Sequence, residues 1–310
     1  MRLGTRASAL ASVQARTVAE WLRAGGASVE MVPVSTEGDR STQPLTQIGG
    51  TGVFASALRS ALLRGEIDLA VHSLKDLPVA DHPGLTLAAI PVREDPRDVV
   101  ITASGETLAQ LPFGARVGTG SPRRAGQLTA CHPHLRIQDI RGNVDTRIAK
   151  VANGEVDAVV LAKAGVNRLG RTHEVSHVLE LEEMLPAPGQ GALAVECRDP
   201  HPSEQASEHD RAVHSACAVL DDVVTRACVG AERAMLARLE AGCTAPVGAV
   251  CTPTDEGFLL RGWAELDGVV SEGRAVGPDP ESLGRRLADT LLHQIQTEPT
   301  APILVTERES

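Results

Sequence analysis

The sequence contains very few aromatic residues. Aromatic side chains make up 2% of its 310 residues, and Tyr is absent. Proteins that bind single-stranded nucleic acid stack the bases on aromatic rings, so this class of function is disfavoured. The formal net charge of −10 also repels nucleic acid and anionic membrane surfaces. We therefore expect no nucleic-acid or membrane partner, and hydrophobic cores built from Ala, Val, Leu and Ile.

Several other signals are missing as well. No apolar run approaches the roughly 20 residues that span a bilayer, and residues 1–10 lack the apolar segment of a secretory signal. The six cysteines show neither CxxC spacing nor a histidine at metal-ligand spacing. The phosphate-binding patterns GxxxxGK[ST] and GxGxxG after a strand are absent. We expect a cytoplasmic protein without a bound metal, in which most cysteines are small buried residues.

A basic segment stands out within this acidic chain. Residues 116–150 contain seven basic residues and only two acidic ones. A small basic region in an acidic body favours a small, multiply charged anion over a long polyanion. A solvated basic face explains the charge equally well. The basic residues are Arg116, Arg123, Arg124, Arg136, Arg141, Arg147 and Lys150.

Three junctions have the pattern of a helix N-terminus with arginine beside it. Residues Ser121–Arg124 (SPRR) place Ser at the cap and Pro at the first helical position. Arg6–Ser8 and Arg141–Asn143 repeat the arrangement, the latter with Arg147 in the helix that follows. Helix N-termini present free N–H groups to anions, and arginine adds paired donors for carboxylates. Taken singly, each junction is more often only a capped helix.

Short apolar strands alternate with amphipathic helices in the N-terminal part, which predicts mostly parallel α/β sheets. Residues 65–71 (GEIDLAV) are echoed by residues 154–160 (GEVDAVV). Such helix–Gly–strand units are common in α/β proteins, but two similarly wound lobes would also produce the echo. A cleft would then lie at the carboxyl ends of their strands, where ligands bind.

We expect three domains. Domain 1 is predicted to comprise residues 1–92 and 189–210, domain 2 residues 93–188, and domain 3 residues 211–310. Domain 3 is predicted to be a small α+β unit, with a helix over 212–239 that breaks near Asp221. Strands near 245–250 and 258–265 and a helix over 281–294 are expected to follow.

Two further residues are candidates for chemistry. Asp76, in the polar run HSLKDLP that closes an apolar strand, is placed to stabilise a cation or move protons. A strand-end Asp in a Pro-terminated turn accounts for it as well. Cys243 lies between Gly242 and Thr244 on a predicted loop, where a thiol is accessible as a nucleophile or attachment point. Position alone does not separate this role from that of an ordinary loop cysteine.

Seven short motifs cover about the first 250 residues. They are GTRAS (4–8), VHSLKDLP (71–78), REDPRD (93–98), GTGSPRR (118–124), RGNVDTR (141–147), PAPGQG (186–191) and EAGCTAP (240–246). Together, and in this order, they resemble the porphobilinogen deaminase (hydroxymethylbilane synthase) family. The combination is highly specific, although no single motif is.

The resemblance implies two lobes like those of type II periplasmic binding proteins and a smaller α+β C-terminal domain. It implies a monomeric transferase of porphyrin and haem biosynthesis. The family joins four porphobilinogen molecules head to tail and releases ammonia at each addition. Its primer is a dipyrromethane cofactor held through a thioether to a cysteine, which matches Cys243 here.

The match to the family also assigns residues. Asp76 corresponds to the catalytic residue, whose carboxylate would stabilise the azafulvene cation that forms when ammonia leaves. Besides Cys243, the residues implied to bind the cofactor are Ser73, Lys75, Thr119, Ser121, Arg123 and Arg124. Those implied to bind the substrate and the growing chain are Arg6, Ser8, Arg141, Arg147, Arg168 and Gln190. Guanidinium groups suit the acetate and propionate that every pyrrole carries.

The loop before residue 53 departs from the family pattern. Gln47 and Thr51 stand where many members carry lysine, so contact between this loop and substrate carboxylates is in doubt. This leaves an alternative hypothesis, a two-lobed module that binds a small polycarboxylate without catalysis. Asp76 and Cys243 argue against it, because a pure binder needs neither.

Overall fold

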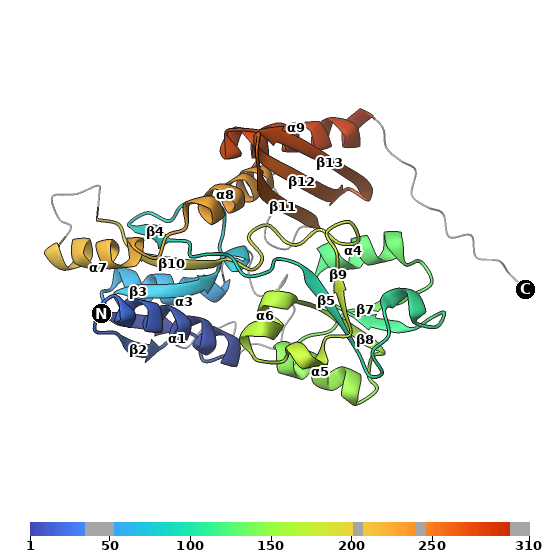
Figure 1. Cartoon of the computed structure of the whole chain (residues 1–310), viewed down its shortest axis with the longest axis horizontal. Helices are drawn as coiled ribbons and strands as arrows, with labels where there is room; N and C mark the ends of the chain where they lie inside the picture. The colour runs from blue at the N-terminus through green and yellow to red at the C-terminus, as the bar shows by residue number, and fades with distance from the viewer. Residues whose placement is uncertain (35–52, 201–206, 240–245, 298–310) are drawn as a thin grey trace, which may run out of the picture.

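The computed structural model describes residues 1–34, 53–200, 207–239 and 246–297. The loop over residues 36–52 and Cys243, the predicted attachment residue, lie outside these residues. Figure 1 shows two lobes, each built around a sheet, and a third unit packed against both.

The first sheet has the strand order β2-β1-β3-β10-β4. Strand β1 runs parallel to β2 and β3, whereas β10 runs antiparallel to β3 and β4. The sheet is therefore mostly parallel, as predicted. Its strands are β1 (Arg2–Thr5), β2 (Glu30–Pro33), β3 (Leu69–Ser73), β4 (Leu85–Ala89) and β10 (Leu193–Arg198).

The second sheet repeats this plan with the order β7-β6-β8-β5-β9. Strand β6 is parallel to β7 and β8, and β5 is antiparallel to β8 and β9. The chain crosses between the lobes before β5 and returns before β10. The strands are β5 (Asp98–Thr102), β6 (Arg116–Gly118), β7 (Arg136–Gln138), β8 (Ala158–Ala162) and β9 (His177–Leu179).

Helices cover both faces of each sheet, and their caps follow the predicted residues. Ser8 accepts a hydrogen bond from the Ala11 amide at the start of α1, Ser121 caps α4, and Asn143 caps α5. The helices of the two lobes are α1 (Ala9–Ala24), α3 (Val53–Leu63), α4 (Pro122–Cys131), α5 (Val144–Ala152) and α6 (Lys163–Arg168). Short 3-10 turns are η1 (Leu74–Asp76), η2 (Leu108–Gln110) and η3 (Thr172–Glu174).

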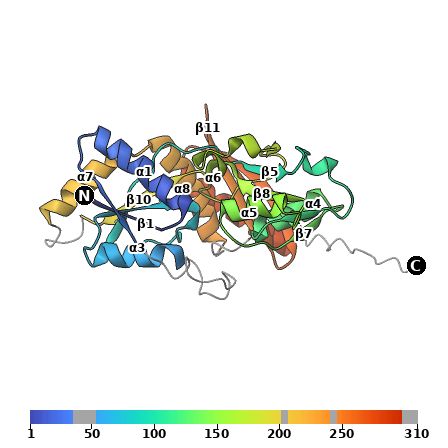
Figure 2. The ribbon, with the colours of Figure 1, turned by 90° about the horizontal axis from the view of Figure 1, so that it is seen from below.

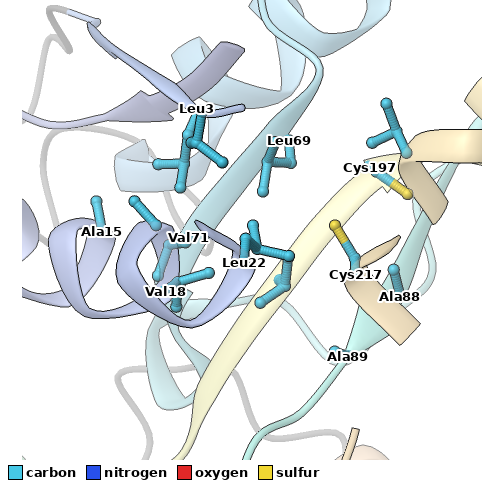
Figure 3. Close-up of a cluster of buried hydrophobic side chains, with 14 of the residues drawn as sticks. Leu3, Ala15, Val18, Leu22, Leu69, Val71, Ala88, Ala89, Cys197 and Cys217 are labelled. Carbon is cyan, nitrogen blue, oxygen red and sulfur yellow. The ribbon is translucent and has the colours of Figure 1, made fainter. Parts of the chain in front are cut away.

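Aliphatic side chains and cysteines form the core of the first lobe, as the shortage of aromatics requires. Figure 3 shows Val18 and Leu22 of α1 packed against Leu3 and Val71 of the sheet. Helix α7 (Glu208–Ala218) adds Cys217 to the same cluster. The expected start of domain 3 at residue 211 therefore divides a helix that packs on the first sheet. Of the five described cysteines, only Cys131 is exposed, and the other four are buried.

The echo in sequence corresponds to a repeated structural unit. Asp68 accepts hydrogen bonds from the backbone amide and the guanidinium of Arg2. Asp157 accepts the same pair of bonds from Arg116. Each aspartate follows a glycine with positive φ and leads into the central strand of its sheet. The repeated motif therefore joins β1 to β3 and β6 to β8 in the same way, each time linking a strand to the central strand beside it.

The third unit is a three-stranded antiparallel sheet, β11-β12-β13, with two helices on one face. Its elements are α8 (Val223–Arg238), β11 (Val247–Thr254), β12 (Gly257–Leu266), β13 (Val269–Gly277) and α9 (Pro280–Thr297). The helix break near Asp221 is confirmed, because α7 ends at Ala218 and α8 begins at Val223. The strand β13 was not predicted.

The predicted fold class is confirmed: two α/β lobes and a smaller α+β unit. Across the described ranges, no helix is both long and apolar enough to cross a membrane.

Candidate functional site

Two neighbouring cavities lie near the carboxyl ends of β3 and β8, where the lobes meet. They share Leu10, Gln14 and Ser73. The first, called the cationic cavity below, has as its charged lining residues Lys75, Arg124, Arg147 and Arg168. The second, called the Asp76 cavity, has as its polar residues Arg6, Ser8, Gln14, His72, Ser73 and Asp76. The structure thus brings most of the predicted site residues together.

Helices from both lobes form the walls of the cationic cavity. In Figure 2, as in Figure 1, α6 of the second lobe lies beside α1 of the first. Gly165 of α6 faces Leu10 of α1, and a methyl group at Gly165 would meet the Leu10 side chain at 3.7 Å. Arg168, at the end of α6, donates to the Gly191 carbonyl at 2.7 Å. The cavity is therefore closed partly by residues that precede β10.

The turn after β3 carries Lys75 and Asp76. Leu74 and Leu77 on either side of this pair are buried, and the Leu74 amide donates to the Ala192 carbonyl. These anchors direct Lys75 to the cationic cavity and Asp76 to its neighbour. Asp76 itself is exposed. The described residues therefore leave this carboxylate open to water.

The pKa of Lys75 is shifted from its ordinary value. Burial lowers the pKa of Lys75 to about 8, and Arg124 adds to this shift while Asp76 opposes it. Its ammonium group donates to Gln190 Oε1 at 3.2 Å. An ammonium group with this pKa gains from a second anionic partner, because the partner favours its charged form.

Arg123 and Arg124 are engaged inside the protein. Both are buried and donate to the two oxygens of Asp98, each at 2.8 Å. Burial opposes ionisation of Asp98, but the two guanidinium charges outweigh it and hold the pKa of this carboxyl below its usual range. Arg124 still lines the cationic cavity, whereas Arg123 is absent from its lining. No sequence pattern indicated that one aspartate would bind both arginines.

Gln190 is completely buried behind the cationic cavity. Its amide nitrogen donates to Asp98 and to the Pro96 carbonyl, each at 2.7 Å, and its oxygen accepts from Lys75. Neither cavity includes it among its lining residues. Its side chain therefore meets Lys75 and Asp98 and not the open space in which a substrate would lie.

The remaining arginines occupy different depths. Burial lowers the pKa of Arg147 to about 10, and Arg124 and Arg141 reinforce this shift. Burial also lowers the pKa of Arg168, against the opposing charge of Glu94. Arg141 is partly exposed, pairs with Asp139 at 3.4 Å, and lines neither cavity. Arg147 and Arg168 are therefore the arginines of this group placed to meet a ligand directly.

Two predicted residues act locally, and one residue was missed. Ser121 caps α4, and its amide donates to buried Thr119 at 3.2 Å. The missed residue is Gln14, which lines both cavities and exchanges hydrogen bonds with Ser73 at 2.9 and 3.3 Å. Its position nearly two turns after the Ser8 cap, on the apolar face of α1, was the available signal. Within the described ranges, no cluster of His, Cys, Asp and Glu has the arrangement of a metal site.

The chain was compared with known proteins. The model for "Porphobilinogen deaminase, dipyromethane cofactor binding domain" matches residues 1–217, and that for "Porphobilinogen deaminase, C-terminal domain" matches residues 226–293. Porphobilinogen deaminase 1 of Streptomyces coelicolor is 52% identical over 95% of both chains. Porphobilinogen deaminase of Mycobacterium tuberculosis is 55% identical over 86% of this chain and 87% of its own.

Solved structures were also compared. The methionine-binding protein MetQ aligns with a TM-score of 0.43 and 12% identity, over 70% of this chain and 89% of its own. The two family models together span both lobes and the third unit. The chain therefore belongs to the porphobilinogen deaminase family.

Proposed function

We propose that this chain is a hydroxymethylbilane synthase, which joins four porphobilinogen molecules head to tail and releases ammonia at each addition. The observation that carries the proposal is the pair of adjoining cavities, one cationic and one containing Asp76. A polycarboxylate chain fits the first, and the carboxylate in the second lies next to it. A site for binding alone would need only the cations.

The cationic cavity suits the dipyrromethane cofactor. Among the described residues, Arg123 and Arg124 pair with buried Asp98, and the charges of Asp76 and Asp98 favour the ammonium form of Lys75. The buried Nε of Arg124 has no hydrogen-bond partner among the described residues, so donors remain for acetate and propionate groups. We assign Lys75 and Arg124 to direct contact, with Ser73, Thr119, Ser121 and Arg123 supporting them, and Cys243 to the thioether. When bound, the cofactor supplies a pyrrole carbon that attacks the substrate.

Asp76 is assigned the catalytic role. Each addition breaks the bond between the methylene carbon and the nitrogen of the porphobilinogen aminomethyl group and joins that methylene to the attacking ring carbon. The ring carbon then loses a proton, and this proton and the departing ammonia leave together as ammonium. The positive charge that develops on the substrate as ammonia leaves would face the Asp76 carboxylate. Arg6 and Ser8 line the same cavity and would bind the carboxylates of the incoming molecule. Porphobilinogen would thus be held through its carboxylates by Arg6 and Ser8, while its aminomethyl group loses ammonia beside Asp76.

The other arginines would hold the growing chain. Arg147 and Arg168 face the cationic cavity, and Arg141, at the start of the same segment as Arg147, would meet later rings. Gln190 would act through Lys75, whose ammonium it orients. A longer chain brings more carboxylates, and these cations match that increase.

We also infer the assembly and the location of the protein. We place domain 1 at residues 1–92 and 189 to the end of α7, domain 2 at 93–188, and domain 3 after α7. The packing of Val213 and Cys217 in the first core supports this boundary. We further propose a cytoplasmic monomer, which is what membership of the family implies.

Intact mass spectrometry tests the assignments. Wild-type protein should exceed the chain mass by one dipyrromethane, and Cys243→Ala should show the bare chain mass. Asp76→Asn should retain the added mass while its turnover of porphobilinogen falls by more than about 100-fold, in the range of a lost electrostatic group. Wild-type turnover by Asp76→Asn would refute the role of Asp76, and a pyrrole adduct on Cys243→Ala would refute the attachment site.

A further inference from the structure

Helix α8 connects the third unit, the crossings between the lobes and the turn that carries Asp76. It runs from Val223 to Arg238 and precedes the segment that contains Cys243. Two adjacent residues, Glu232 and Arg233, reach different neighbours from this helix. Thr225 and Glu232 contact Arg93, whereas Val229 and Arg233, one turn apart, face the turn that carries Asp76.

Glu232 joins the third unit to both crossings between the lobes. Its side chain is completely buried. It accepts hydrogen bonds from the Arg93 guanidinium at 2.6 and 3.0 Å, from the Gly189 amide at 2.7 Å and from the Cys251 amide at 2.9 Å. Arg93 in turn donates to the Gln190 carbonyl at 2.7 Å. The first crossing, the return crossing and β11 are thus fixed to one point on α8.

Arg233 attaches the same helix to the Asp76 turn. Its guanidinium donates to the Leu77 carbonyl at 3.2 Å and to the Pro78 carbonyl at 2.7 Å. These carbonyls directly follow Asp76 in the chain. Val229 packs in one cluster with Leu74 and Leu77, which flank the turn. The backbone after Asp76 is therefore held by α8 and not by its own lobe alone.

We propose that Arg233 is a positioning residue, which fixes the Asp76 turn relative to helix α8 and the crossings between the lobes. The inference rests on the role proposed above for Asp76. Because Glu232 anchors α8 at the crossings, the two bonds from Arg233 transmit that anchorage to the turn. The catalytic carboxylate then keeps one position relative to α8 and the crossings while the lobes meet. A planar guanidinium presents fixed donors to two successive carbonyls, whereas an ammonium on a flexible stem lacks this rigid fork.

Arg233 is a better test of this link than Glu232. Removal of Glu232 would leave Arg93 without its carboxylate in a buried site and would disturb folding. Arg233 is only partly buried, so its replacement should leave the fold intact. Arg238, on the same helix, pairs with Asp289 at the surface and provides a matched control. The variants are Arg233→Met, Arg233→Lys and Arg238→Met, all made as cofactor-loaded full-length protein.

Four measurements define the expected result. Arg233→Met should keep the mass of the loaded enzyme and lower the thermal midpoint by about 5 °C or less. Its kcat should fall about 10- to 100-fold with KM within about twofold, because a displacement near 1 Å can cost about 100-fold. Hydrogen exchange in a peptide covering residues 74–79 should accelerate. Arg233→Lys should recover part of kcat, and Arg238→Met should match wild type.

Several results would overturn the proposal. Unchanged kcat and unchanged exchange in Arg233→Met would show that the bonds do not position the turn. Loss of the cofactor mass or unfolding of both Arg233 variants would show a role in assembly instead. Asp76→Asn, measured alongside, separates the two levels. If Asp76→Asn is inactive and Arg233→Met is normal, only the positioning role fails. If Asp76→Asn turns over normally, the proposed role of Asp76 fails first.

Discussion

Replacement of Asp98 by Asn should destabilise the protein more than any surface change of the same chemistry. Asp98 is fully buried and compensates two guanidinium groups whose side chains are 3% and 6% exposed. Asn has the same shape, but one carbonyl oxygen and no charge. Removing one partner from a buried ion pair costs about 3–5 kcal/mol. We expect a loss near the middle of that range, which lowers the thermal midpoint by on the order of 10 °C.

Thermal unfolding of the loaded enzyme, followed by circular dichroism, would measure this effect. Asp157→Asn is the matched control, because Asp157 also pairs with an arginine but is 41% exposed beside a partner that is 38% exposed. Water already screens this second pair, so its loss should change the midpoint little. Equal shifts in the two variants would refute the reasoning that burial makes the Asp98 pair costly to break.

The same prediction has a pH signature. The pKa of Asp98 lies below its usual range in the folded protein, while an unfolded Asp titrates near pH 4. The stability that Asp98 contributes is therefore complete above roughly pH 5 and is lost as the pH falls through the acid range. The gap between wild type and Asp98→Asn should narrow below about pH 4. A gap that stays constant down to pH 3 would contradict this account.

Two further predictions concern Lys75 and two helical glycines. In the unloaded Cys243→Ala protein, the reaction of Lys75 with acetic anhydride should have its pH midpoint near 8, because burial lowers the pKa of Lys75 to about 8. In the loaded enzyme, the cofactor carboxylates should move this pH midpoint upward. Identical pH profiles in the two proteins would contradict contact between the cofactor carboxylates and Lys75. Gly126→Ala should lower the thermal midpoint, because its Cβ would lie 2.8 Å from the Trp263 ring. In Gly230→Ala the added methyl group would meet no described atom outside its own helix within 4 Å. This change should raise the free energy of unfolding by about 1 kcal/mol through helix propensity, and with it the thermal midpoint. A shift of the same sign in both variants would refute the steric argument.

Features that depend on neighbouring residues in the chain could be predicted from the sequence, whereas features that depend on pairing between distant residues could not. Ser8, Ser121 and Asn143 cap helices because each cap depends on residues within three positions. Strand β13 was missed because glycines and charges interrupt its alternation (VVSEGRAVG), and only pairing with β12 makes it a strand. Asp98 binds arginines 25 and 26 residues away, a distance that no local pattern encodes.

The candidate site was predictable to a similar extent. The family motifs pointed to Lys75, Asp76, Arg124 and Arg147, and the structure brings these residues to two neighbouring cavities. The motifs do not indicate how deeply a side chain is buried. The burial of Gln190 and the exposure of Asp76 therefore became known only from the packing in the structure. Whether each residue performs its assigned role stays a prediction for the variants described above.

The two crossings between the lobes have a consequence for synthesis of the chain. All strands of the second sheet come from the continuous stretch 98–179, whereas the first sheet needs β10, made after it. Strand β10 lies between β3 and β4, so these two strands have no common neighbour until residue 198 is translated. During vectorial synthesis, the lobe begun second therefore becomes complete first. Once residues up to about 185 have emerged from the ribosome, the nascent chain should hold a closed second lobe beside an unfinished first one.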